Sequence, residues 1–160
     1  MQKLTLVAIC LVVLSSLAMA QNNLDTKWHC MKPAAEQSYP AADSVHNYGA
    51  AQGTCNATSS KTGEKSGSYT EAIETTKTSI SNRGTYVVTM EDGDKTYYTY
   101  SGNASPVQKT GSNKWKIMGG TGKYKAAKGA GTCSGKLNDD GSSDWTCSGT
   151  FSAGGTAGAQ

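Results

Sequence analysis

The sequence predicts an all-β fold, a sandwich or barrel of short antiparallel strands. Beyond residue 20, no segment repeats its apolar residues with a helical period, and Thr, Ser, Gly, Tyr and Val dominate. Turn residues recur at short intervals, although the chain has only three prolines. Near the C-terminus, Cys133 and Cys147 frame a run with its turn residues at the centre, which is the pattern of a disulfide-linked β-hairpin.

The first 20 residues have the pattern of a secretory signal peptide. Lys3 gives a positive start, Leu4–Leu14 is an apolar core too short to span a bilayer, and Ala18-Met19-Ala20 is a cleavage site of small residues. We therefore expect a secreted or periplasmic protein with no membrane anchor after cleavage. Its mature chain, residues 21–160, is expected to form a single domain. Cleavage would also remove Cys10.

Four cysteines remain in the expected mature chain: Cys30, Cys55, Cys133 and Cys147. An even number of cysteines in an exported protein favours two disulfides, and three pairings are open. We expect the local pairing, Cys30 with Cys55 and Cys133 with Cys147. A zinc site would require short C-x-x-C or C-x-x-H spacings, which are absent, so no metal is expected.

Alternating side chains and the turn residues between them predict eight strands. The segment Lys32–Gln52 is predicted to be an ordered loop, and the small, polar residues from Ser152 to Gln160 are predicted to form a flexible tail. The expected strands are Thr26–Met31, Gly53–Thr58, Ser68–Ser79, Thr85–Glu91, Lys95–Ser101, Lys114–Met118, Lys125–Lys136 and Ser143–Phe151.

Two hairpins can be aligned residue by residue. Pairing the last two strands about Asp140 sets Cys133 opposite Cys147 and places Trp145 on the same face, which predicts Trp145 in the core. In the run Glu91-Asp92-Gly93-Asp94, the Asp-Gly dipeptide is typical of a two-residue type I′ turn. Pairing the first and last residues of this run divides the tyrosines between the two faces, Tyr86 with Tyr97 on one and Tyr98 with Tyr100 on the other.

Between these hairpins, the run Trp115–Gly129 reads Trp-Lys-Ile-Met-Gly-Gly-Thr-Gly-Lys-Tyr-Lys-Ala-Ala-Lys-Gly. Because glycine tolerates positive φ, Gly119, Gly120 and Gly122 are assigned to a tight turn and not to catalysis. A hydrophobic strand followed by G-G-T-G-x-Y and A-x-G resembles the signature of allene oxide cyclases, dirigent proteins and related small secreted bacterial proteins. The resemblance covers about Trp115–Phe151. It implies an eight-stranded antiparallel β-barrel of the calycin type, often with a central apolar cavity.

The resemblance carries no catalytic residue of the plant enzymes onto a position of this chain, so cyclase activity would rest on fold analogy alone. The weak catalytic candidate is Glu71. If Tyr69, Glu71 and Ile73 face the interior, burial raises the pKa of this carboxyl and suits it to acid–base chemistry; surface exposure is the simpler interpretation. His29 and His46 are far apart in the sequence and are expected to be surface or structural histidines.

Aromatic residues indicate where a ligand would bind. Rings supply contact area, and phenolic hydroxyls orient a bound molecule. An eight-stranded barrel is wide enough either to be packed solid or to hold one small ligand, and the sequence agrees with both. The residues predicted to border any small-molecule site are Tyr86, Tyr97, Tyr98, Tyr100 and Trp115.

We therefore expect a protein that binds a small apolar or aromatic molecule in its lumen, without transforming it and without a cofactor. The first alternative is a cyclase or dirigent-like protein that steers ring closure or coupling of a bound intermediate. The second is a non-catalytic surface or interaction module. Nucleic acid is not an expected partner, because the chain has a single arginine, Arg83, and no nucleic-acid-binding motif. The oligomeric state is left open.

Overall fold

The computed structural model describes residues 22–154, which are all-β apart from one short 3-10 turn at Gly122–Tyr124. The predicted fold class is confirmed. The predicted signal peptide, residues 1–20, lies outside the described residues, as do residues 155–160 of the predicted tail. The strands are β1 (Asn22–Cys30), β2 (Ala35–Pro40), β3 (Asn47–Ser60), β4 (Glu64–Thr75), β5 (Ile80–Met90), β6 (Lys95–Ser105), β7 (Thr110–Gly120), β8 (Lys128–Leu137) and β9 (Ser143–Ser152).

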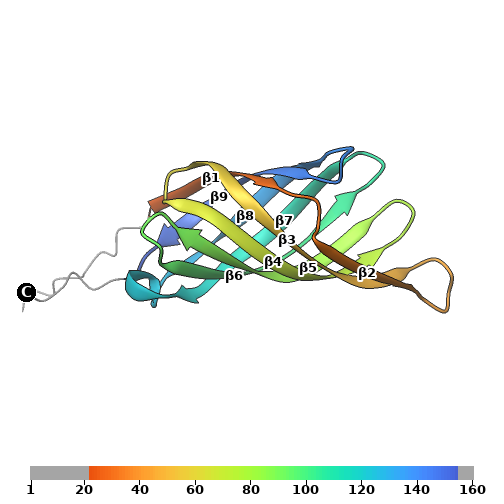
Figure 1. The fold of residues 1–160 in the computed structure, drawn as a ribbon, viewed down its shortest axis with the longest axis horizontal. Helices are drawn as coiled ribbons and strands as arrows, with labels where there is room; N and C mark the ends of the chain where they lie inside the picture. Colours follow the sequence, from red (N-terminus) through yellow and green to blue (C-terminus); the bar gives the residue numbers. More distant parts are fainter. Residues whose placement is uncertain (1–21, 155–160) are drawn as a thin grey trace, which may run out of the picture.

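Eight of these nine strands form a closed antiparallel barrel (Figure 1). Each strand from β3 to β8 pairs with the strand that follows it, and β1 pairs with both β9 and β3, which closes the sheet on itself. The closing seam pairs residues 26–30 of β1 with residues 55–60 of β3. The ninth strand, β2, lies along the first half of β3, and this hairpin reaches beyond the others at one end of the barrel (Figure 1).

The structure corrects the loop predicted at Lys32–Gln52. This segment contains β2 and the beginning of β3, which are paired from Ala35 opposite Gln52 to Pro40 opposite Asn47. All six residues of β2 are exposed, so this strand has no buried face and no alternation of apolar and polar residues by which it could be predicted. The predicted tail also begins too early, because Ser152 ends β9 and Ala153 packs against the core.

The turn between β5 and β6 is one residue longer than predicted. The Met90 N–H donates to the Asp94 carbonyl at 2.8 Å, and the Gly93 N–H donates to the Met90 carbonyl at 3.0 Å. Gly93 has a φ of +87°, the left-handed conformation that ends a three-residue hairpin loop. The predicted two-residue turn is therefore wrong.

That additional residue changes which tyrosines share a face. Tyr86 pairs with Tyr98, and both lie on the inner face together with Tyr100. Tyr97, which was predicted on the same face as Tyr86, points outward and is 38% exposed. A shift of one residue in a strand register moves every side chain of that strand to the opposite face.

Both predicted disulfides are present, Cys30–Cys55 and Cys133–Cys147. Cys133 pairs directly with Cys147 across β8 and β9, which confirms the predicted register about Asp140. Cys30 pairs with Cys55 across β1 and β3, at the seam that closes the barrel. One disulfide therefore links a hairpin, and the other links strands that are brought together only by closure.

The glycine run ends β7 with a bulge and a tight turn. Gly119 has a φ of +126° at the bulge between β6 and β7. Gly122 has a φ of +49°, and the Asp94 carboxylate occupies the space that a side chain would need. At Gly120 the constraint is steric, because a Cβ there would lie 2.1 Å from the Lys95 carbonyl oxygen. These contacts support the structural role that was predicted for the three glycines.

Replacing Gly120 with valine is expected to destabilise the barrel by about 1–3 kcal/mol, because the new side chain has no room beside the Lys95 carbonyl. Thermal unfolding followed by circular dichroism measures the change in Tm. The matched control is Lys116→Val, which introduces the same side chain on the exposed face of the same strand. An unchanged Tm in the Gly120 variant would contradict the structural role.

Candidate ligand-binding cavity

The barrel is packed at one end and hollow toward the other. At the packed end, the side chains of Val88, Met90, Thr96 and Phe151 are almost completely buried. Toward the opposite end, the lumen contains a cavity of about 550 Å³. Residues at the β1–β2, β4–β5, β6–β7 and β8–β9 connections border its mouth. Its volume falls in the usual range of small-molecule sites, about 300–1,000 Å³.

Four aromatic side chains from four strands form a continuous row that lines the cavity. The ring centroids are 5.3 Å apart for Trp28 and Tyr86, 6.4 Å for Tyr86 and Tyr98, and 5.7 Å for Tyr98 and Trp115. Neighbouring rings are tilted or edge-to-face, which is the arrangement that aromatic pairs favour. Along β5, Val88 and Met90 follow Tyr86 on the inner face, so the row crosses the lumen near its packed end as an aromatic floor, and Val88 and Glu64 line the deepest part of the cavity beneath it.

Glycines on the inner face explain how so many aromatic residues leave the lumen open. A Cβ at Gly53 would lie 2.4 Å from the Tyr69 hydroxyl oxygen, and one at Gly131 would lie 2.4 Å from the Trp115 ring. The rings therefore lie against the barrel wall, over positions that have no side chain. The aromatic residues that follow this pattern are Tyr69 over Gly53, Tyr86 over Gly67, Tyr100 over Gly84, Trp115 over Gly131 and Gly149, and Trp145 over Gly135.

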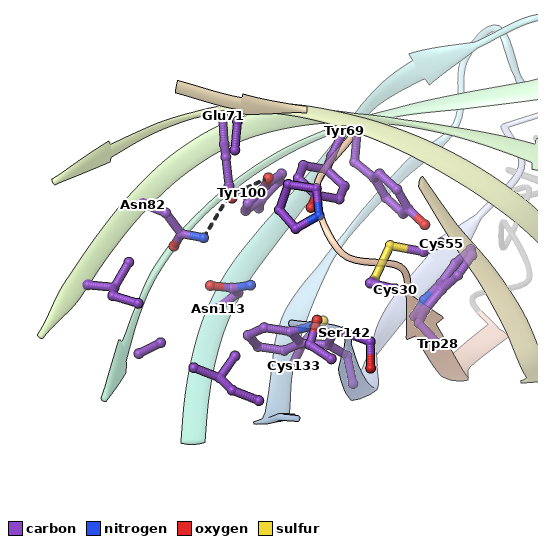
Figure 2. A pocket seen from close by; sticks show the side chains of 18 of the residues that line it. Trp28, Cys30, Cys55, Tyr69, Glu71, Asn82, Tyr100, Asn113, Cys133 and Ser142 are labelled. Atoms are coloured by element: carbon purple, nitrogen blue, oxygen red, sulfur yellow. Dashed lines mark hydrogen bonds between the residues drawn. A yellow bond between two sulfur atoms is a disulfide. The ribbon is translucent and has the colours of Figure 1, made fainter. Parts of the chain in front are cut away.

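A carboxylate, Glu71, faces the cavity from β4. Its Oε2 accepts hydrogen bonds from the Tyr100 hydroxyl and from the side-chain amide of Asn82, each at 2.8 Å (Figure 2). Gly84 lies between Glu71 and Tyr100 on β5, and its missing side chain lets Tyr100 reach across the strand. Within residues 22–154, Oε1 of Glu71 has no hydrogen-bond partner, so it is available to a bound molecule.

Burial sets the protonation of the groups around Glu71. It raises the pKa of Glu71 itself, and the hydrogen bonds from Tyr100 and Asn82 oppose that rise. Burial, with a contribution from the Glu71 charge, raises the pKa of Tyr69 to about 12 and that of Tyr100 still further. At neutral pH, the cavity therefore offers phenolic hydroxyls and no phenolates.

A second carboxylate, Glu64, lines the deep end of the cavity and is 3% exposed. Its oxygens accept hydrogen bonds from the hydroxyls of Thr26 at 3.1 Å and Thr62 at 2.7 Å, and also from the hydroxyl of Ser60. Hydroxyl donors thus surround Glu64, and none of the ion pairs among the described residues includes it. Sequence analysis did not single out this residue.

Polar atoms without an internal partner gather around the cavity. Five buried side-chain atoms in the described part of the chain make no hydrogen bond, and all five belong to cavity-lining residues. Leaving such an atom unpaired costs about 1–3 kcal/mol, so their concentration at one place is typical of a functional site. The atoms are Asn82 Oδ1, Tyr86 Oη, Tyr98 Oη, Asn113 Oδ1 and Trp115 Nε1.

The structure brings together most of the residues predicted to border a ligand site. Tyr86, Tyr98, Tyr100 and Trp115 line the cavity, whereas the outward-pointing Tyr97 does not, so its assignment to the cavity is wrong. The expectation that Glu71 lies on the surface is also wrong. Tyr69, Glu71 and Ile73 all face inward, which was the condition for Glu71 to act as a buried carboxylate.

The predicted depth of Trp145 is corrected as well. Trp145 lines the cavity but is only partly buried, whereas Trp115 belongs to the buried core cluster and is 7% exposed. The physical reason is its place along the strand. Trp145 lies near the mouth, two residues from the start of β9, and its indole N–H donates to the Ser143 hydroxyl at 2.9 Å. Trp115 lies deeper, opposite Gly131.

Four of the lining residues not predicted from the sequence bear on the site, and two of them carried a usable signal. Trp28 lies two residues before Cys30 in a strand, and the inward direction of the disulfide places both on the inner face. Asn113 lies two residues before Trp115 in a strand, so the prediction of Trp115 at the cavity also places Asn113 on the inner face. Asn82 and Glu64 alternate with residues that are themselves polar or charged, so the pattern has no contrast between the two faces.

The two histidines lie away from the cavity. His29 Nδ1 is 2.8 Å from an Asp144 carboxylate oxygen, and His46 Nδ1 is 2.7 Å from an Asp43 carboxylate oxygen, both in exposed settings. The Asp43 hydrogen bond raises the pKa of His46, and the His46 and Val45 backbone N–H groups help to lower the pKa of Asp43 to about 2. Both histidines have the surface positions expected from the sequence.

No protein-family model matches this chain, and no curated protein matches it either. Among the described residues, the structure contains no helix of the length and hydrophobicity needed to cross a membrane.

Proposed function

We propose that this protein binds a small apolar or aromatic molecule in the lumen of its barrel. The observation that carries the proposal is the cavity of about 550 Å³, whose floor is a row of four aromatic rings. Apolar walls with a few convergent polar groups are the usual composition of a small-molecule site. Among these polar groups, Glu71 presents an open acceptor, because its Oε1 has no hydrogen-bond partner among the described residues.

A second candidate function is supported by Glu71. In this proposal, the barrel confines a reactive intermediate and steers its ring closure or coupling, as the sequence resemblance to allene oxide cyclases and dirigent proteins implies. A carboxyl with a raised pKa beside the Tyr100 hydroxyl is a pair that exchanges protons with a bound molecule. Binding without transformation ranks first, because Glu71 is the single carboxyl group facing the middle of the cavity among the described residues, and a second one is not at hand to work with it.

The alternative function, a surface or interaction module, has less support. Contacts on the outer surface would not require a hollow lumen with unpaired polar atoms. For the site of action, we propose export to the periplasm or the exterior. Two disulfides in the described chain support it, because disulfides persist in oxidising compartments.

Uptake of Nile red, a neutral apolar dye, tests the proposal. The purified protein is expected to bind the dye and to enhance its fluorescence. Ile73→Trp is expected to weaken binding at least about tenfold, because Ile73 lines the cavity and a larger side chain there narrows the space open to the dye. The readout is a fluorescence titration, with circular dichroism to confirm that the variant is folded.

The matched control is the adjacent residue. Ala72 lies on the same strand and is exposed on the outer face, so Ala72→Trp adds a similar bulk outside the barrel and should leave binding unchanged. A wild-type protein that takes up no dye, or two tryptophan variants that behave alike, would overturn the proposal and favour the interaction module.

A further inference from the structure

Acidic side chains line the interior of the barrel, and the basic ones among the described lining residues stay at its mouth. Two carboxylates, Glu71 on the wall and Glu64 at the deep end, line the cavity below its mouth. Among the described lining residues, the basic ones are Lys32 and Lys109, and both are exposed at the mouth. Lys109 is already paired with Asp139 there. Neither interior carboxylate therefore has a positive partner, which is a costly arrangement for buried charge.

The walls of the cavity suit a positive charge for a second reason. Seven aromatic side chains line it, and the face of an aromatic ring attracts a cation. Tyr69 and Tyr100 flank Glu71, so rings and carboxylate act on the same part of the lumen. The lining rings are those of Trp28, Tyr69, Tyr86, Tyr98, Tyr100, Trp115 and Trp145.

Glu71 and two asparagines of the cavity lining carry oxygens without a hydrogen-bond partner in the described chain. Oε1 of Glu71 has no partner within the described chain. Asn82 uses its amide N–H on Glu71, which leaves its carbonyl oxygen unpaired. Asn113 and Asn82 are each paired with Gly102, from opposite sides, and the Asn113 carbonyl oxygen lies over this glycine, also unpaired. Because these amide oxygens have almost no accessible surface, Oε1 of Glu71 is the acceptor that an N–H donor in the lumen meets first.

We propose that the cavity is selective for organic cations: small aromatic or apolar molecules that carry an ammonium group, seated with the charge at Glu71 and the hydrophobic part over the aromatic floor. The inference rests on the proposed binding function and names its ligand class. Ammonium donates to Glu71 Oε1, and it gains from the rings of Tyr69 and Tyr100. The same charges disfavour organic anions, including carboxylic acids of similar size.

Three naphthalene probes of similar size and different charge test the selectivity at pH 7: 2-naphthylmethylammonium, neutral 2-naphthylmethanol and anionic 2-naphthoate. Isothermal titration calorimetry measures the three affinities with the full mature protein. The ammonium probe is expected to bind about tenfold more tightly than the alcohol, and the naphthoate more weakly than both. All three tryptophans of the chain line the cavity, so quenching of their fluorescence gives an independent titration.

Glu71→Gln should remove most of the preference for the ammonium probe over the alcohol. Glutamine keeps the shape of the side chain and still accepts from Tyr100. The matched control is Glu74→Gln, which removes the same charge from the same strand at a residue outside the cavity lining. This control should keep the wild-type ranking.

The outcomes distinguish a failure of the proposed binding function from a failure of the proposed selectivity for cations. If none of the probes binds, the proposed binding function fails. If the alcohol binds and the ammonium probe binds no more tightly, the binding function stands and the selectivity for cations is wrong; this comparison needs only the wild-type protein. Equal loss of the preference in the Glu71 and Glu74 variants would attribute it to overall charge, and would overturn the role of Glu71.

Discussion

Replacing Trp115 with alanine is expected to lower the free energy of unfolding by about 3–5 kcal/mol. The side chain is 7% exposed and belongs to the buried core cluster. Its ring packs edge-to-face on Tyr98 and covers Gly131 and Gly149 of the two following strands. Truncation leaves an open space where three strands meet, and the glycines on β8 and β9 have no side chains with which to fill it. Urea unfolding followed by circular dichroism measures the loss.

Trp145→Ala is the matched control, and its loss of unfolding free energy should be clearly smaller than that of Trp115→Ala. Trp145 is only partly buried near the mouth of the cavity, and solvent can enter the space that its ring leaves. If the Trp145 variant were the more destabilised of the two, the order of burial described above would be contradicted. The sequence predicts Trp145 in the core and Trp115 at the ligand, whereas in the structure both line the cavity and Trp115 is the more deeply buried.

Removing the seam disulfide with the double substitution Cys30→Ala and Cys55→Ala is expected to cost roughly 3–4 kcal/mol. The two cysteines are 25 residues apart, so the bond restricts a long loop of the unfolded chain. In the folded state, it links β1 to β3 at the end of a seam of five paired residues that is interrupted by a bulge. We also expect weaker uptake of Nile red, because this seam is part of the cavity wall.

The variant with Cys133→Ala and Cys147→Ala provides the comparison. Its cysteines are 14 residues apart, and the chain-entropy model gives a loss of roughly 3 kcal/mol. β8 and β9 are held by ten residue pairs along a continuous hairpin, so they should stay paired and dye uptake should persist. Chemical denaturation and dye titration of both variants measure the two effects. Equal loss of dye uptake in both would show that the seam has no special part in holding the cavity.

Features that depend on neighbours in the chain could be predicted from the sequence. The Cys133–Cys147 hairpin is an example: its strands are joined by a short turn, and the positions of the cysteines about Asp140 fix their pairing. The β5–β6 hairpin shows the limit of this reasoning. A single additional loop residue, with Gly93 in the left-handed conformation, turned Tyr97 out of the barrel.

The candidate site was predictable only in part, because its polar residues come from different strands. Glu71 is on β4, Asn82 on β5, Tyr100 on β6 and Asn113 on β7. Tyr100 reaches Glu71 because Gly84 stands between them, and this requires the registers of two successive strand pairs at once. No local pattern in the sequence contains that information.

The sequence by itself determined the all-β class, the Cys133–Cys147 disulfide and the register of the last hairpin, since alternation, turn residues and cysteine spacing act over short stretches of chain. Only the tertiary structure decided that β1 closes the barrel against β3, that aromatic rings lie over inward glycines, and that the lumen is hollow. These features depend on the combined registers of eight strands, because closure fixes which inward positions meet across the lumen.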